Sequence, residues 1–336
     1  MSRRPSSLLG LLGLLVAAGC ALRGPARRFD VEPAAFGRGS APILLVHGLL
    51  ITGFRPIAGM TTFDAAIVAA LRADGFDVWL PALPAVAPPA ARVDDLLRAI
   101  DEVRARTGAA RVHVVAHSQA GIDARLLLDD PRAAGKVIAV VTLSSPHDGT
   151  PMAEVARRLR GSLAEAYINR AARRIDESRG WPSLEGRLRE TTAALGPERM
   201  ARFNAEHPST PVPLFSIAAT PAPAADGSCD GGAWPAPRRA GRWNGFMAIG
   251  SELLDEALGG HVANDGFVPT ASQRFGIFLG CAPVDHMGWL QDRATGFPAS
   301  RFFVELARAL RDLERTGDPA AFLAHGAALG RLADGR

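Results

Sequence analysis

The sequence is poor in lysine, and its basic residues do not gather in one place. Lys136 is the only lysine, so the 38 basic residues are almost all arginines, and 34 acidic residues are interspersed with them. The formal net charge is +4. A nucleic-acid-binding surface needs a clustered basic patch, so we predict no nucleic-acid partner. The balance of 48% hydrophobic and 21% charged residues excludes a disordered chain.

The sequence also has no hydrophobic run long enough to cross a bilayer. The apolar stretch 8–18 has about a dozen residues, whereas a spanning helix needs roughly 20. It follows two arginines and ends in Val-Ala-Ala-Gly before Cys20, so residues 1–19 are predicted to be a signal peptide of the lipoprotein type. Lipid attachment at Cys20 predicts an exported outer-membrane or cell-surface lipoprotein. Ordinary cleavage nearby would instead leave a secreted protein.

Cysteine is scarce as well: besides Cys20, directly after the predicted leader, the chain has only Cys229 and Cys281. Two cysteines in an exported protein indicate one disulfide, although two unrelated free thiols are the alternative. A bridge between them would stabilise the fold by about 2–4 kcal/mol.

A short stretch in the middle of the chain has the pattern of a nucleophile elbow. The β-branched apolar run 112–115 predicts a buried strand, residues 116–121 a six-residue turn, and residues 122–129 a helix. Ser118 lies on the turn between them, where strain requires small neighbours. Ala116 and Ala120 stand where the usual pattern has glycines, and Gly121 comes one residue later. A serine at this place can also be a simple helix N-cap.

The rest of the chain alternates strands with helices, which predicts an α/β fold with a mostly parallel central sheet flanked by helices. Residues 20–40 are expected to be a linker and residues 41–315 the main domain. A strand-free helical stretch at about 151–211 is expected to be a cap or lid, and residues 316–336 a C-terminal helix or tail. The expected strands are 43–46, 78–80, 112–115, 137–143, 214–218 and 275–279, and the expected helices outside the lid are 61–73, 93–107, 122–129, 302–313 and 322–332.

A reactive serine needs a histidine to accept its proton and a carboxylate to orient that histidine. On this architecture the order is serine, acid, histidine, which selects Asp265 in an Asn-Asp-Gly turn and then His286. His261 precedes the acid, and Asp285 is too close along the chain to reach the ring of His286.

The oxyanion that forms during acyl transfer needs backbone N–H donors. We predict that these are the N–H of Gln119, next after the serine, and the N–H of Leu49, in the loop after strand 43–46. His47 is interpreted as a structural hydrogen-bonding residue of that loop.

Together these motifs resemble the bacterial secreted triacylglycerol lipases of the Pseudomonas and Burkholderia type, over about residues 41–295. The matching segments are 46–49, 117–119, 145–150, 201–208 and 263–268. The resemblance implies an α/β-hydrolase fold. In the family an acid two residues after the catalytic histidine helps to hold calcium, but Gly288 stands there in this chain. We therefore predict no metal or other cofactor, with Asp255 and Asp292 as the alternative carboxylates for a structural calcium. Some relatives also need a folding chaperone.

We therefore predict a carboxylic-ester hydrolase that acts on lipid esters through an acyl-enzyme at Ser118. A lipid interface would be contacted through the lid and an N-terminal lipid anchor. The alternatives are a polyester depolymerase or a phospholipase with the same triad, and a non-catalytic surface lipoprotein on the same fold.

Overall fold

A computed structural model of the chain describes residues 29, 39–49, 63–152, 187–291 and 296–334, together with single positions between 153 and 186. The predicted signal peptide and Cys20 lie outside the described residues. So do most of the predicted linker, most of the helical stretch expected after residue 153, and Asp292. The limits of the leader, linker and lid therefore stay predictions.

The centre of the fold is a sheet of six parallel strands in the order β2-β1-β3-β4-β5-β6. This confirms the predicted α/β architecture. Since all strands run the same way, their carboxyl ends lie along one edge of the sheet. The strands are β1 (Ile43–Val46), β2 (Val78–Trp79), β3 (Val112–His117), β4 (Val137–Leu143), β5 (Leu214–Ala219) and β6 (Ile277–Ala282).

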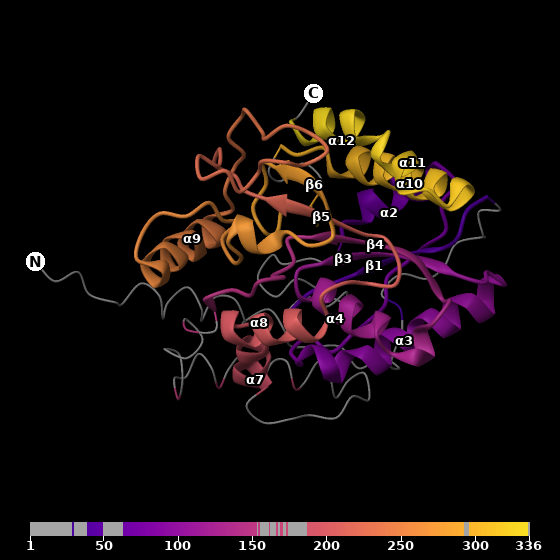
Figure 1. The fold of residues 1–336 in the computed structure, drawn as a ribbon, viewed down its shortest axis with the longest axis horizontal. Helices are drawn as coiled ribbons and strands as arrows, with labels where there is room; N and C mark the ends of the chain where they lie inside the picture. The colour runs from indigo at the N-terminus through magenta and orange to yellow at the C-terminus, as the bar shows by residue number, and fades with distance from the viewer. Residues whose placement is uncertain are drawn as a thin grey trace, which may run out of the picture.

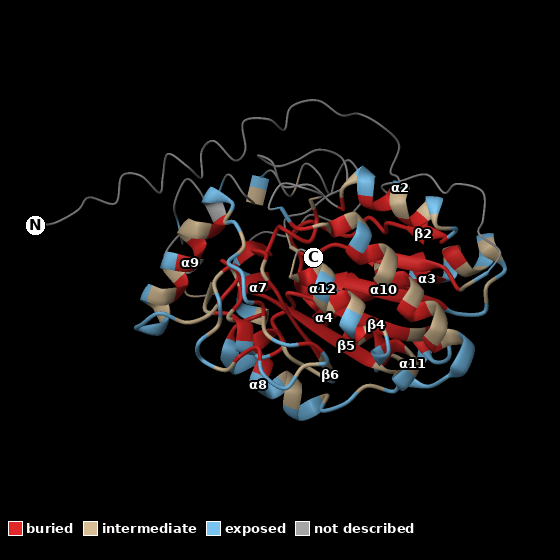
Figure 2. Cartoon of the chain, turned by 90° about the horizontal axis from the view of Figure 1, so that it is seen from above, coloured by how far each residue is buried: buried red, intermediate tan, exposed pale blue. Residues whose placement is uncertain are grey.

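Helices cover both faces of the sheet (Figure 1). One face carries α2 (Ala65–Ala73), α10 (Ala299–Thr316), α11 (Pro319–Leu323) and α12 (Gly326–Ala333). The opposite face carries α3 (Pro89–Thr107) and α4 (Gln119–Leu128). Alternate strand residues point to the two sides: Ile43 and Leu45 join the first core, Leu44 and Val46 the second. Figure 2 shows the resulting buried layers on either side of the strands.

Several boundaries differ from the sequence prediction; α4, for example, begins at Gln119 rather than residue 122, and α10 is longer than expected at both ends. Helix α3 begins at Pro89 rather than residue 93, because proline is well tolerated in the first turn of a helix. Strand β6 begins two residues later than predicted and continues through Gly280 to Ala282. The glycine is needed there, since a Cβ would lie 2.4 Å from the indole nitrogen of Trp234. The single helix expected at 322–332 is two short helices, α11 and α12.

Helix α9 (Gly245–Leu258) has no counterpart in the sequence prediction. Its two glycines lower the helix propensity of the stretch. Gly250 is required by packing, since a Cβ there would lie 2.2 Å from the carbonyl oxygen of Gly266. Helix α9 thus packs closely against the turn that contains Asp265.

Two helices described in the predicted lid region are α7 (Arg187–Ala194) and α8 (Pro197–Glu206). Met200 of α8 is buried against Ile122 of α4 and Leu195. In the described part of the chain, no helix combines the length and apolarity that crossing a membrane would require.

Candidate active site

Ser118 lies on a tight turn between β3 and α4, at the carboxyl edge of the sheet. Its φ of 59° is in the left-handed region, which is strained for a residue with a side chain. Two backbone hydrogen bonds hold the turn: the Ser118 N–H donates to the carbonyl oxygen of Leu143 at 2.8 Å, and the Gly121 N–H donates to that of Ser118 at 3.0 Å. The serine hydroxyl is therefore presented by a rigid turn.

Close packing explains the small residues around this turn. A Cβ at Gly121 would lie 2.2 Å from the Oγ of Ser145, so this glycine lets α4 approach the segment after β4. Ala116 and Ala120 are completely buried. The glycine that the turn needs is therefore Gly121, one place later than in the usual motif.

The structure brings Ser118, His286 and Asp265 into one hydrogen-bonded chain. His286 Nε2 is 2.9 Å from Ser118 Oγ, and His286 Nδ1 is 2.8 Å from Asp265 Oδ2. Because the carboxylate can only accept, Nδ1 carries the proton, and Nε2 is free to accept from the serine hydroxyl. Ser118 is 9% exposed and His286 is 4% exposed, so a small part of the site is accessible from solvent while most of it is shielded from water.

Asp265 is held in place by its own turn. Its Oδ1 accepts hydrogen bonds from the backbone N–H groups of Phe267 at 3.0 Å and Val268 at 2.8 Å. The carbonyl oxygen of Asp265 also accepts from the N–H of His286 at 2.8 Å. The carboxylate and the imidazole are therefore linked by side chain and backbone together.

His117 ties the histidine loop to the elbow, a role that the sequence did not indicate. Its Nε2 donates to the carbonyl oxygen of His286 at 2.7 Å, and the two rings are 4.7 Å apart. Burial, reinforced by His286, holds the pKa of His117 well below its ordinary value. The ring therefore stays neutral and acts as a hydrogen-bond donor.

The loop after β1 passes directly beside the serine. A Cβ at Gly48 would lie 2.6 Å from the Cβ of Ser118, so only glycine allows this approach. Leu49 packs against Val86 and Leu188, and Gln119 begins α4. The two residues predicted to supply oxyanion donors therefore both lie near Ser118: Gln119 follows it in the sequence, and Leu49 follows Gly48, which packs against it.

A completely buried ion pair lies among these elements, and no sequence pattern indicated it. Arg92 Nε is 3.2 Å from Asp123 Oδ2, and both side chains are 0% exposed. Arg92 Nη2 also donates to the carbonyl oxygen of His47 at 2.6 Å. Burial raises the pKa of Asp123 to about 6, against the opposing effects of Arg92 and a hydrogen bond from Gln119.

His47 has the structural role that we predicted. Its Nε2 accepts a hydrogen bond from the Leu83 N–H at 3.1 Å, and its Nδ1 is 2.9 Å from the carbonyl oxygen of Gly48. Gln119 Nε2 donates to the carbonyl oxygen of Ala87 at 2.6 Å. These bonds fix the loops that border the serine.

A family model described as alpha/beta hydrolase fold matches residues 41–215, which is more than half of the 336 residues. The chain belongs to the alpha/beta hydrolase family. It is 33% identical over 174 residues to a triacylglycerol lipase of Pseudomonas fragi, covering 50% of this chain and 57% of that one. It is 31% identical over 116 residues to a triacylglycerol lipase of Burkholderia plantarii, covering 34% and 31%. These similarities confirm the resemblance that the motifs suggested.

A solved structure, EstA from Clostridium botulinum, matches this chain with a TM-score of 0.58 over 90% of this chain and 97% of that one. The sequence identity is 15%, so this likeness concerns the fold alone. The matches to the two lipases cover less than two-thirds of the relatives' own lengths, 57% and 31%. The fold prediction is confirmed.

The segment 145–150, one of the segments that resemble the lipases, supports the candidate site from the side of β4. Asn204 of α8 donates from Nδ2 to the carbonyl oxygen of His147 at 2.9 Å. Thr150 Oγ1 donates to the carbonyl oxygen of Phe267, in the acid turn, at 2.5 Å. The segment therefore connects the described part of the lid region to the acid turn.

The described residues do not suit a calcium ion. Gly288 has no room for a carboxylate, since a Cβ there would lie 2.7 Å from the Cβ of Val284. Asp255 is occupied by His261 Nδ1 at 2.8 Å and by the Val262 N–H at 3.1 Å. Across the described part of the chain, no group of three metal-binding side chains converges. Asp292 lies outside it.

Asp285 does not contact the ring of His286, as expected. Its two oxygens accept from the backbone N–H groups of Asn244 at 2.5 Å and Met287 at 3.0 Å. Burial raises the pKa of this carboxyl, an effect that these two hydrogen bonds oppose. Its position fixes the loop around His286.

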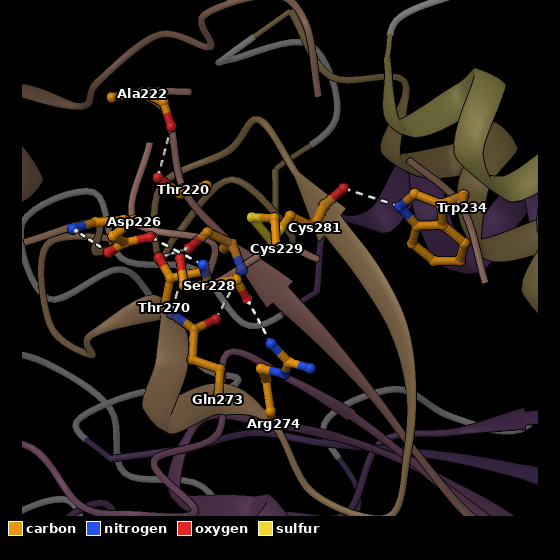
Figure 3. The surroundings of a disulfide bond; sticks show 12 residues. Thr220, Ala222, Asp226, Ser228, Cys229, Trp234, Thr270, Gln273, Arg274 and Cys281 are labelled. Atoms are coloured by element: carbon orange, nitrogen blue, oxygen red, sulfur yellow. Dashed lines mark hydrogen bonds between the residues drawn. A yellow bond between two sulfur atoms is a disulfide. The ribbon is translucent and has the colours of Figure 1, made fainter. Parts of the chain in front are cut away.

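The predicted disulfide is present, between Cys229 and Cys281 with their Cα atoms 5.5 Å apart. It joins the long loop after β5 to strand β6 (Figure 3). Beside it, the indole N–H of Trp234 donates to the carbonyl oxygen of Cys281 at 3.0 Å, and Arg274 donates to that of Ser228 at 3.2 Å. The loop that precedes α9 is thereby fixed to the sheet.

Proposed function

We propose that this protein is a serine carboxylic-ester hydrolase that acts on lipid esters through an acyl-enzyme at Ser118. The observation that carries the proposal is the chain of hydrogen bonds from Asp265 through His286 to Ser118. The similarity to triacylglycerol lipases of Pseudomonas fragi and Burkholderia plantarii supports lipid esters as the substrate class.

In the first half of the reaction, Ser118 Oγ attacks the ester carbonyl carbon while His286 Nε2 accepts the hydroxyl proton. Asp265 keeps the imidazole oriented and stabilises it once it is protonated. The tetrahedral oxyanion receives hydrogen bonds from the backbone N–H groups of Leu49 and Gln119. His286 then gives its proton to the departing alcohol, and an acyl group remains on the serine.

In the second half, water attacks the acyl-enzyme and His286 accepts a proton from it. The oxyanion forms again at the same two N–H groups and collapses to release the fatty acid. The proton returns to Ser118 Oγ, which restores the resting enzyme. Every proton passes through one nitrogen atom, so the position of His286 governs both halves.

A fluorophosphonate probe tests the central claim, because it reacts only with an activated serine. We expect the parent protein to be labelled, and expect no labelling of the heat-denatured parent or of Ser118→Ala. Asp265→Asn should be labelled far more slowly, since it holds the imidazole in the wrong tautomer. A native parent that stays unlabelled would favour the non-catalytic surface lipoprotein.

The substrate class is tested with an ester series. We expect emulsified triacylglycerols and long-chain p-nitrophenyl esters to be hydrolysed faster than polyester films or phospholipid vesicles. Faster turnover of a film or of a phospholipid would replace the lipase assignment with the corresponding alternative, while the triad would stay the same.

We also propose export and a lipid anchor at Cys20, supported by the leader sequence alone. Expression in a bacterium fed labelled palmitate should give a labelled parent and an unlabelled Cys20→Ser variant. Equal absence of label in both would leave ordinary secretion as the better description.

A further inference from the structure

The long loop after β5 ends in a cationic segment with no role in the proposed chemistry. Residues 238–243, which we call the arginine loop, have the sequence Arg-Arg-Ala-Gly-Arg-Trp. All three arginines are exposed. Arg239 and Arg242 make no ion pair or hydrogen bond in the described part of the chain. Arg238 differs from the other two, because its backbone N–H donates to Asp334 Oδ1 at 3.2 Å and a carboxylate therefore lies beside it.

The arginine loop is fixed in place rather than free. The Gly241 N–H donates to the carbonyl oxygen of Pro221 at 2.7 Å, and a Cβ at Gly241 would lie 1.7 Å from the carbonyl oxygen of Pro283. Upstream, the disulfide and Trp234 hold the same loop to β6. Arg239 and Arg242 therefore stand on either side of Gly241 in the sequence, and Gly241 packs directly against the backbone of Pro283.

This anchor point lies on the same edge of the sheet as the proposed catalytic residues. Pro221 follows the end of β5, and Pro283 follows the end of β6. Ser118 follows the end of β3, and His286 comes three residues after Pro283. Because all six strands are parallel, these positions share the carboxyl edge. The cations and the reactive serine thus lie on one side of the molecule.

Trp243 adds an amphipathic ring to the same segment. It is partly exposed, while the ring packs against the core formed with α10. No hydrogen bond of its indole N–H to the described residues is present. Tryptophan beside arginine, with one side of the ring apolar and the other wet, is typical of residues at a lipid headgroup boundary.

We propose that the arginine loop docks the protein on an anionic phospholipid surface and turns its catalytic edge toward the lipid. Guanidinium groups suit phosphate oxygens because they can donate two parallel hydrogen bonds. The charges of Arg239 and Arg242, which no described residue pairs, complement such a surface, and Trp243 enters the headgroup layer. The docking itself rests on charge and position, and its benefit to catalysis rests on the proposed function.

The test measures sedimentation with large vesicles of phosphatidylglycerol, of phosphatidylcholine, and of their mixtures. Every protein carries Ser118→Ala, so that no lipid is hydrolysed, and Cys20→Ser, so that no acyl anchor contributes. We expect binding to rise with the phosphatidylglycerol content and to fall as salt is added. Arg239→Ala/Arg242→Ala should bind about 30-fold more weakly, and the charge reversal Arg239→Glu/Arg242→Glu more weakly still.

The matched control reverses two arginines at the opposite edge. Arg111 precedes β3, and Arg315 is in the last turn of α10, next to Glu314, which accepts from the Ala41 N–H just before β1. Arg111→Glu/Arg315→Glu changes the net charge by the same amount as Arg239→Glu/Arg242→Glu. It should retain vesicle binding within about threefold. Equal losses in the two variants would reduce the effect to overall charge and overturn the proposal.

Two further readouts distinguish docking on lipid from a general attraction to polyanions. Vesicles should shift the tryptophan emission to shorter wavelength in the parent but not in Trp243→Phe. Unchanged emission in the parent, or binding to soluble poly-glutamate without binding to vesicles, would overturn the proposal. Since none of these measurements needs hydrolysis, failure of the fluorophosphonate test would leave the docking result standing, and the reverse also holds.

Discussion

The ring of His117 donates a hydrogen bond from Nε2 to the carbonyl oxygen of His286 at 2.7 Å, across 169 residues of sequence. The residue before the proposed nucleophile therefore holds the backbone of the residue that would activate it. Both members of the contact are buried, so water cannot replace the lost donor if His117 is removed. An uncompensated buried carbonyl costs about 1–3 kcal/mol.

Replacing His117 should lower kcat more than it changes KM. In His117→Leu the imidazole of His286 is less well positioned, and small displacements cost up to about 100-fold in rate. We expect kcat on a soluble p-nitrophenyl ester to fall by roughly 10- to 100-fold, with KM changed less than about twofold. His117→Gln, which keeps a donor, should recover part of the rate. A Leu variant with the parent kcat would contradict this role.

A methyl group on Gly48 should disable the site without unfolding the protein. In Gly48→Ala the new Cβ would meet the Cβ of Ser118 at 2.6 Å, so the loop after β1 must move away from the serine. We expect kcat/KM to fall by about 100-fold, because Leu49 moves with the loop. Gly39→Ala is the matched control, since nothing lies within 4 Å of its Cβ. Equal activity of the two variants would exclude a role for this contact.

The sequence was sufficient for the sheet, and for choosing the three residues that the structure joins in one hydrogen-bonded chain, because both leave local signals. The β-branched runs at 43–46 and 137–143 coincide with β1 and β4, and the run at 112–115 is the first part of β3, which continues to His117. Asp265 and His286 were selected by their order after Ser118 and by the Asn-Asp-Gly turn. Strand β6 is only partly predicted, because Gly280 in its second half is required by the close approach of Trp234, which is distant in sequence.

The rest of the site depends on contacts between distant elements, which a single sequence does not display. Arg92 lies one residue before the predicted helix 93–107, and its burial arises only when α3 packs against α4 and the loop after β1. The same holds for helix α9, whose glycines reduce its helical signal but allow it to approach Gly266. The periodicity of a sequence predicts which face of a helix is apolar, but it does not predict which charged side chain will be buried by other elements.

Breaking the buried pair of Arg92 and Asp123 from one side should be costly. Arg92→Met leaves a buried carboxylate, and Asp123→Leu leaves a buried guanidinium, so each should lower the free energy of unfolding by about 3–5 kcal/mol. The double variant Arg92→Met/Asp123→Leu should lose at least about 2 kcal/mol less than the sum of the singles. Urea unfolding of the four proteins measures this coupling.

The matched control for this cycle is the exposed pair Arg98 and Asp95, whose side chains are 57% and 17% exposed. Arg98→Met/Asp95→Leu and its single variants should each change the free energy of unfolding by less than about 1 kcal/mol. Additive losses in the buried cycle would show that Arg92 and Asp123 act on stability independently of each other.

A second cluster predicts how stability depends on pH. His325 lies between two carboxylates of α10, with Nδ1 2.7 Å from Glu305 and Nε2 3.0 Å from Asp312. Burial would lower the pKa of His325, but the hydrogen bonds that the ring donates to Glu305 and Asp312 outweigh it and raise the pKa above its ordinary value. The charged imidazole is therefore favoured in the folded state.

A raised folded-state pKa means that the folded protein binds this proton more tightly than the unfolded chain. The stabilisation from His325 is fully present below the unfolded value of about 6.5, and is lost as the pH rises through the higher folded value. His325→Gln should therefore reduce the free energy of unfolding at pH 6 by on the order of 1 kcal/mol more than at pH 9. His261→Gln, at a pair whose histidine is 76% exposed, serves as control and should show a smaller difference. Urea unfolding of the three proteins at both pH values decides, and a His325→Gln cost that is equal or larger at pH 9 would contradict the argument.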